Sequence, residues 1–471
     1  MTDKAVRDPY RDGRVWHPRA YRWRRFLNWF PLGLAYAMLY MGRYNLTVAQ
    51  GALSEHRLMP KDAFGDIFGV GALVYGCAFL LNGPLTDRIG GRRAMLLALF
   101  GACGANLAMG WYTRQALLGG SAEAEAIRLV FMVLYGVNMY FQSFGAVSIV
   151  KVNASWFHVR ERGGFSGIFG IMISSGIFFA FDVNERVLKY TAGSGPQGID
   201  PTWLVFFVPA AGLLAMLLLE AAVLRDVPSQ AGHADIHTGD ATADEDDRPI
   251  PTRQLMKRIL THPIILTIAA IEFCSGVLRN GVMHWFRIYA KEQQGALQAA
   301  AQGALGPAPA SAWSWALENW GLLLMIAGIL GGNFAGWVSD KLFHSRRAPA
   351  AALLYGLLTA CTVLMFFSLD WPWVLVGAVF FMSLAVIGVH GLLSGTATMD
   401  FGGRKGAATA VGIIDGFVYL GTAVQSVALG RLTKLAWIYW PAFLLPFAVL
   451  ALVLLGRIWH AVPSGGRKGG H

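Results

Sequence analysis

The chain has 471 residues, of which 55% are hydrophobic and only 14% are charged, and its mean hydropathy is +0.47. This composition excludes an ordinary soluble protein of 51.1 kDa and indicates a protein that crosses a membrane many times. The net charge of +11 would suit nucleic-acid binding, but the placement of the cations gives it a simpler explanation.

Twelve apolar stretches are long enough to cross a bilayer as helices. In chain order they lie at approximately 26–48, 63–85, 94–112, 126–150, 163–183, 203–223, 263–287, 315–337, 350–369, 372–398, 407–430 and 437–458. The sequence therefore predicts an all-α membrane protein with twelve transmembrane helices in the lipid bilayer.

The lysines and arginines gather on one side of these predicted helices. Residues 1–25 are strongly basic, and most of the cations in loops follow the even-numbered helices. Because cytoplasmic loops carry the excess of Lys and Arg, we expect both termini to be cytoplasmic. The basic segment 1–25 would then lie next to the first helix, beside anionic lipid. Because this explains its positive charge, no nucleic-acid partner is expected. No cleavable signal segment is visible, and the first helix is expected to remain in the protein.

The predicted helices fall into two halves. Residues 225–262 are polar and acidic, as a cytoplasmic linker with a disordered centre would be. GPLTDRIGGRR at 83–93 recurs loosely as GWVSDKLFHSRR at 336–347, each copy after the second helix of its half. We therefore expect two pseudo-symmetric six-helix bundles. The predicted parts are a basic N-terminus 1–25, a bundle 26–224, the linker 225–262, a bundle 263–458 and a cytoplasmic tail 459–471.

Two arginines, Arg43 and Arg279, are lone cations inside predicted helices, at matching points of the two halves. An arginine at mid-membrane depth costs at least ~2.5–3.5 kcal/mol, so it normally faces a cavity and meets an anion or a partner charge. The planar guanidinium suits bidentate contact with a tetrahedral oxyanion. The pair predicts one anion site between the halves, and structural ion pairs inside the bundles are the alternative. Tyr36 and Tyr40 share a helix face with Arg43, either to line that site or to pack between helices.

The sequence contains no pattern typical of an enzyme or of a metal site. It has neither a phosphate-binding loop of the G-x-x-x-x-G-K-[ST] type nor the G-x-S-x-G and H-E-x-x-H motifs. The four cysteines lie in apolar stretches without paired spacing and are expected to be packing residues. We expect no enzymatic activity, no cofactor and no metal.

The segment 83–93 resembles the signature loop of the major facilitator superfamily, in which an aspartate caps a helix end and neighbouring cations clamp adjacent helices. This resemblance implies that Asp87 and Arg88, with Asp340 and Lys341, are gating and structural residues on the cytoplasmic side.

A narrower resemblance is to the organophosphate:phosphate antiporter family of glycerol-3-phosphate and hexose-phosphate transporters. It is carried by YMGRYN at 40–45, ERGG at 161–164, RDVPSQAG at 225–232, LRNGVMHWFRIYAKE at 278–292 and KGAATAVGIIDGFVYLG at 405–421. The resemblance implies that Arg43 and Arg279 bind a phosphate near the midplane. It also implies a monomer in a bacterial inner (plasma) membrane.

The chain departs from that family at several positions. Phe79 and Ile173 stand where the family has a lysine and a histidine, whereas Lys151 keeps a basic residue, either for the site or to snorkel to the interface. Glu272 and Asp415 are acids where the glycerol-phosphate carriers have neutral residues. Three roles are open for these two acids: proton coupling, recognition of a cationic head group on the substrate, or pairing with Arg279 or Lys151 to offset buried charge.

These features together predict a secondary transporter with alternating access. Its expected substrate is an organic phosphate or a related organic anion, exchanged for inorganic phosphate. One alternative is a proton-coupled organic-anion symporter, because RYNLTVA at 43–49 also resembles the anion:cation symporters. A membrane sensor of external sugar phosphate is an alternative of another class.

Overall fold

The structure is a computed structural model, and it consists almost entirely of helices. Two short strands, β1 (Tyr10–Arg11) and β2 (Arg14–Val15), pair antiparallel ahead of the first helix. The structure describes residues 10–11, 14–119, 124–158, 171–172, 174–191, 201–236, 261, 263–302, 312–343, 346–393 and 407–460.

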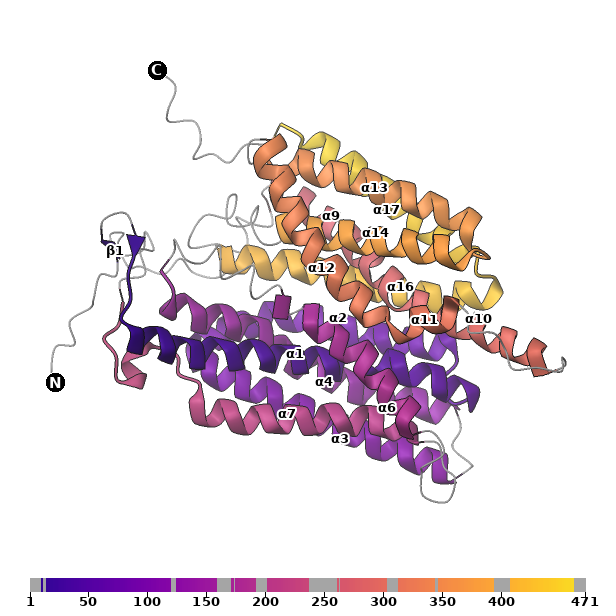
Figure 1. The fold of residues 1–471 in the computed structure, drawn as a ribbon, viewed down its shortest axis with the longest axis horizontal. Helices are drawn as coiled ribbons and strands as arrows, with labels where there is room; N and C mark the ends of the chain where they lie inside the picture. The colour runs from indigo at the N-terminus through magenta and orange to yellow at the C-terminus, as the bar shows by residue number, and fades with distance from the viewer. Residues whose placement is uncertain are drawn as a thin grey trace.

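The first half of the chain forms one group of helices, drawn in indigo to magenta in Figure 1. Its long helices are α1 (Arg19–Glu55), α2 (Lys61–Ile89), α3 (Gly91–Gly119), α4 (Ala124–Trp156) and α7 (Leu204–Val223). Its shorter pieces are the π-helix η2 (Phe179–Val183), α6 (Asn184–Thr191), and the 3-10 turns η4 (Pro201–Trp203) and η5 (Pro228–Ala231).

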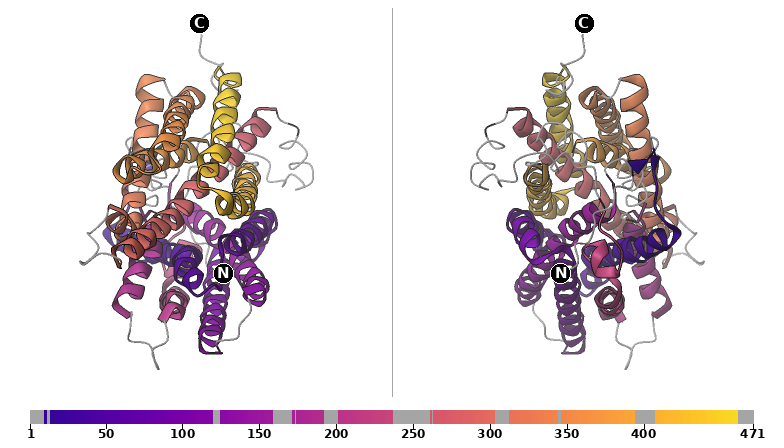
Figure 2. Two further views of the ribbon diagram at one scale, coloured as in Figure 1. Left: turned by 90° about the vertical axis from the view of Figure 1, so that its right-hand side faces the viewer. Right: turned by 90° about the vertical axis from the view of Figure 1, so that its left-hand side faces the viewer.

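The second half forms the other group, drawn in orange to yellow. It contains α9 (Pro263–Met283), α10 (Trp285–Gln302), α11 (Ala312–Glu318), α12 (Trp320–Trp337), the π-helix η7 (Val338–Leu342), α13 (Arg347–Ser368), α14 (Pro372–His390), α16 (Ala407–Leu435) and α17 (Tyr439–Arg457). The two groups lie one above the other in Figure 1, and Figure 2 shows the same division from both ends.

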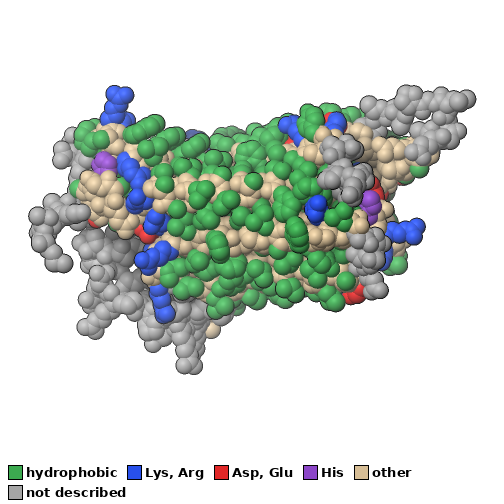
Figure 3. Space-filling view, turned by 90° about the horizontal axis from the view of Figure 1, so that it is seen from below, with side chains coloured by type: hydrophobic (Ala, Val, Ile, Leu, Met, Phe, Trp, Pro, Cys, Tyr) green, Lys and Arg blue, Asp and Glu red, His purple; other side chains and the backbone are tan. Residues whose placement is uncertain are grey.

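Ten helical stretches in the described part of the chain are long and apolar enough to cross a membrane. The remaining two predicted helices correspond to α1, whose centre carries Arg43 and several other polar residues, and to the segment around 171–191, which is described in pieces. Hydrophobic side chains cover the middle of the face seen in Figure 3, and the charged side chains gather toward its two ends. The protein is therefore a multi-pass integral membrane protein, and the predicted all-α fold of two helix bundles is confirmed.

The two bundles meet along α2 and α16, where glycines let the backbones approach closely. A Cβ atom added at Gly65 of α2 would overlap the carbonyl oxygen of Ser426 in α16. A Cβ added at Gly430 of α16 would lie 2.9 Å from the carbonyl oxygen of Lys61. Small residues at helix contacts are the usual means of close packing inside a membrane. The backbones of α2 and α16 therefore join the two bundles in close contact.

Candidate functional site

Arg43 lies at the centre of the molecule, on α1, and its side chain is completely buried. Its Nε donates to Oε1 of Gln142 on α4 at 2.8 Å. Its Nη1 donates to the hydroxyl of Tyr419 on α16 at 3.1 Å, and its Nη2 to the hydroxyl of Tyr75 on α2, also at 3.1 Å. The guanidinium is thus held by three neutral acceptors, and one of them belongs to the opposite bundle.

Tyrosine rings surround the same guanidinium. Its central carbon lies 4.7 Å from the ring centroid of Tyr40 and 4.6 Å from that of Tyr75. Tyr36 packs edge to face on Tyr40, with ring centroids 5.2 Å apart, and the hydroxyl of Tyr135 donates to the carbonyl oxygen of Arg43 at 3.0 Å. Cation–π contacts stabilise the charge without neutralising it. The structure therefore brings Tyr36 and Tyr40 to Arg43, as their shared helix face predicted.

Arg279 reaches the same cluster from the second bundle. Every residue from 274 to 290 is buried except Arg279, which is partly exposed although its neighbours on all sides of the helix are buried. It interacts electrostatically with Tyr40, Tyr44 and Tyr419. Its Nε is buried and has no hydrogen-bond partner among the residues that the structure describes. The two arginines therefore converge on Tyr40 and Tyr419, and Arg279 still has a free donor.

Among the side chains that the structure describes, no carboxylate pairs with the two arginines of this site. Across the described side chains, every ion pair involves other cations, and neither Arg43 nor Arg279 pairs with an acid. Two positive charges remain inside a cluster of phenols and one amide. Such an arrangement can bind a compact dianion, because Arg279 has a donor without a described partner and Arg43 adds a second, fixed positive charge.

The two acids predicted for the site lie beside a histidine in the second bundle. Glu272 on α9 is fully buried, and its Oε2 lies 2.9 Å from Nδ1 of His390 on α14. The partly exposed Asp415 on α16 interacts electrostatically with His390. The charge-balancing alternative had paired these acids with Arg279 or Lys151, but the described partner of Glu272 is His390.

The remaining predicted residues lie away from the arginines. Lys151 is partly exposed near the C-terminal end of α4. Arg88, in the last turn of α2, and Lys341, in η7, are exposed. The side chains of Asp87 and Asp340 lie outside the described part of the structure, as does Ile173.

Several residues of the cluster were not predicted from the sequence: Gln142, Tyr75, Tyr419 and His390. Each is a polar side chain within an apolar helix, which is a weak signal that many packing residues share. Tyr419 had the clearest signal, because it lies four residues after Asp415 and therefore on the same face of one helix. Phe79 packs against the rings of Tyr75 and Tyr419, so this wall of the cluster is aromatic.

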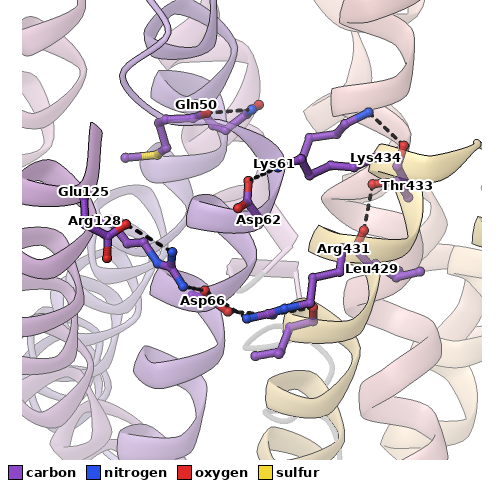
Figure 4. Close-up of polar contacts among 12 residues, drawn as sticks. Gln50, Lys61, Asp62, Asp66, Glu125, Arg128, Leu429, Arg431, Thr433 and Lys434 are labelled. Carbon is purple, nitrogen blue, oxygen red and sulfur yellow. Dashed lines mark hydrogen bonds and ion pairs between the residues drawn. The ribbon is translucent and has the colours of Figure 1, made fainter. Parts of the chain in front are cut away.

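Ion pairs join the two bundles at the end of the molecule opposite the chain termini (Figure 4). At their centre Asp66 of α2 contacts both Arg128 of α4 and Arg431 of α16, the latter at 2.8 Å. We call the six pairs that cross between the halves the inter-bundle ion pairs. They are Asp66–Arg431, Asp62–Lys434, Lys61–Glu292, Glu55–Lys291, Glu185–Arg287 and Lys189–Glu318.

Comparison with known proteins agrees with this architecture. A family model described as Major Facilitator Superfamily matches residues 32–426. The glycerol-3-phosphate transporter of Bacillus subtilis is 25% identical, over 94% of this chain and 94% of its own length. The membrane sensor protein UhpC of Salmonella typhimurium is 23% identical, over 91% of this chain and 89% of its own. A probable hexose phosphate transport protein of Chlamydia pneumoniae is 22% identical, over 96% and 94%.

Among solved structures, a bacterial homolog of the human lysosomal transporter Spinster has the same fold. It superposes with a TM-score of 0.68 at 12% sequence identity, over 95% of this chain and 98% of its own.

Proposed function

The chain belongs to the Major Facilitator Superfamily, and from this premise we propose a secondary transporter that exchanges an organic phosphate, or a related organic anion, for inorganic phosphate by alternating access. One observation carries the proposal. Arg43 and Arg279, one from each bundle, meet at Tyr40 and Tyr419 with no carboxylate partner among the described side chains. A phosphate group bound between them would be held by both bundles, so its presence would favour their closing around it.

The substrate class is supported by two lines of argument. A phosphate dianion matches the two unneutralised charges and the bidentate geometry of guanidinium. The relatives named for glycerol 3-phosphate and hexose phosphate share one chemical feature, a phosphate ester, although they differ in the organic part. The common phosphate is therefore the proposed ligand of the arginines, with Tyr36 and Tyr40 lining the same site.

The finer assignments belong to the same proposal. The termini and the linker 225–262 are cytoplasmic, and the protein acts as a monomer in a bacterial inner membrane. The bundles span 26–224 and 263–458. Asp87 and Arg88, with Asp340 and Lys341, gate the cytoplasmic side, and Lys151 contributes positive charge on that side.

Counterflow in proteoliposomes tests the function directly. Vesicles loaded with unlabelled inorganic phosphate should accumulate labelled phosphate, and external phosphate esters should compete in an order that identifies the organic part. Vesicles without internal phosphate, and vesicles containing the Arg43→Lys/Arg279→Lys double variant, are the controls. Uptake that needs no internal phosphate and is abolished by a protonophore would contradict antiport and would indicate proton symport. Saturable binding of phosphate esters without any flux would instead favour a sensor, as one relative is named.

A further inference from the structure

A buried pair of titratable side chains lies close to the arginine site. Glu272 is fully buried on α9, and its Oε2 lies 2.9 Å from Nδ1 of His390 on α14. The His390 side chain is 27% exposed, whereas that of Glu272 is not exposed at all. The second oxygen of Glu272, Oε1, has no hydrogen-bond partner among the described residues. The carboxylate is therefore the enclosed member of the pair, and the imidazole is the more exposed one.

The groups around this pair come from three neighbouring helices. Asp415 on α16 and Arg279 on α9 interact electrostatically with His390. Tyr355 on α13 and Cys274 on α9 interact with Glu272. Two further helices, α11 and α12, also pack against α14, and neither contains a basic residue. The one acid of α11, Glu318, forms an ion pair with Lys189. His390 thus lies near two acids and one arginine.

This arrangement has the groups needed to hold a proton. A buried carboxylate needs a positive partner, and removing that partner leaves an uncompensated charge. Histidine is the side chain whose ordinary titration falls between about pH 5 and 8. With Nδ1–H donated to Glu272, the exchangeable proton is carried on Nε2. Protonation at Nε2 therefore completes a Glu272–His390 ion pair and adds one positive charge near Arg279.

We infer that Glu272 and His390 form a proton-binding site that is coupled to anion binding at Arg43 and Arg279. The inference rests on the proposed anion site. An anion beside Arg279 offsets the repulsion between that arginine and charged His390, so anion and proton each favour the binding of the other. Among the roles open for Glu272, this geometry favours proton binding over recognition of a cationic head group. The carboxylate is enclosed and already engaged, so it is not presented to a ligand.

The expected consequence is an anion affinity that falls as pH rises. Below the range in which His390 loses its proton, the third positive charge is present and binding is strong. Above that range the charge is absent, and affinity is lower by about 5- to 150-fold, the usual size of a coupling between two sites. Because phosphate itself titrates, the measured quantity must be the difference between the wild type and variants with the same ligand.

Calorimetric titration of the purified full-length protein with inorganic phosphate provides the test. It is run from pH 6 to 9 in buffers of different ionisation enthalpy, so that the protons taken up per bound phosphate are measured. The wild type should take up protons in excess of the Glu272→Gln/His390→Gln variant, in which the pair is replaced by two neutral amides. His390→Lys should keep strong binding to high pH without the extra proton, because lysine stays charged.

The two possible failures give different results. If the wild type and the double variant show the same proton uptake and pH profile while both bind phosphate, the coupling is overturned and the anion site stands. If the wild type binds no phosphate at any pH, the anion site falls and the coupling with it. The control is Arg279→Lys, which should bind phosphate weakly at every pH. Calorimetric heat that is lost in this variant comes from phosphate binding at the arginine site.

Discussion

At the scale of single residues, the two arginines are prepared for different tasks. Arg43 uses three of its donors on Gln142, Tyr75 and Tyr419, so its position is fixed before any ligand arrives. Arg279 keeps a buried Nε without a partner in the described structure. An unsatisfied buried donor costs about 1–3 kcal/mol, which an anion can recover on binding. We therefore expect Arg279 to make the new hydrogen bonds and Arg43 to supply a fixed charge.

Conservative replacement of either arginine should abolish most transport. In Arg43→Lys the ammonium is a point charge that cannot reproduce the fixed fork bound to Gln142, Tyr75 and Tyr419. In Arg279→Lys the proposed bidentate contact with phosphate cannot form. Loss of a charge-assisted hydrogen bond, worth about 1.5–3 kcal/mol, corresponds to a drop of at least about tenfold in phosphate counterflow. Wild-type rates in both lysine variants would contradict the anion site.

The sequence predicted this site in part, and the limit has a physical reason. A charge inside an apolar stretch is costly wherever it lies, so Arg43 and Arg279 stand out without any knowledge of the fold. Gln142 and Tyr75 are recognisable only after the helices are packed, because a neutral polar residue is tolerated on many faces. His390 was missed for the same reason, since its partner Glu272 lies 118 positions away in the chain.

At the scale of the elements, the seventh predicted helix, 263–287, contains one turn residue where the bundles touch. It divides at His284 into α9 and α10, and α10 continues to Gln302. Nδ1 of His284 lies 2.7 Å from Oγ1 of Thr47 on α1, in the other bundle. Hydropathy predicted an apolar span here, and Pro263–Ala299 forms one. No local pattern in the sequence records the contact that this span makes with the other half.

Packing of α2 against α16 gives a prediction at this scale. Gly65→Ala places a methyl group on the carbonyl oxygen of Ser426, so the two helices must separate there. Overpacking of this kind costs about 1–3 kcal/mol, and we expect a lower thermal unfolding temperature in detergent and slower counterflow. Gly83→Ala is the matched control on the same helix, because nothing lies within 4 Å of its added methyl group. Equal stability in the two variants would contradict a tight α2–α16 contact.

At the scale of the whole molecule, the inter-bundle ion pairs join the halves at the end opposite the termini. Asp66 is nearly buried and contacts an arginine from each bundle, and the Glu185–Arg287 pair is also largely buried, whereas Asp62–Lys434 and Lys61–Glu292 are more exposed. The repeat in the sequence predicted two bundles, but it did not predict this closure. Each pair links residues from opposite halves. The number of charged residues in a single loop therefore does not show which residue of the other half each one pairs with.

Alternating access requires the inter-bundle ion pairs to break when the molecule opens at this end. Asp66→Asn removes the carboxylate shared by Arg128 and Arg431 and should shift the equilibrium toward forms open at this end. Arg431 is 53% exposed, so solvent screening limits the effect to about 1 kcal/mol, or about fivefold in the ratio of closed to open forms.

Spin labels measure that shift directly. They are placed at the exposed residues Leu118 of α3 and Leu435 of α16, in a background in which the four native cysteines are replaced. Asp66→Asn should increase the population with long distances between the labels. Glu125→Gln is the matched control, because Glu125 pairs with Arg128 within α4 and joins nothing across the bundles. If Asp66→Asn and Glu125→Gln give the same distance distribution as the parent, the Asp66–Arg431 pair does not control opening. The remaining inter-bundle ion pairs and the glycine contacts between α2 and α16 would then be the described interactions left to hold this end closed.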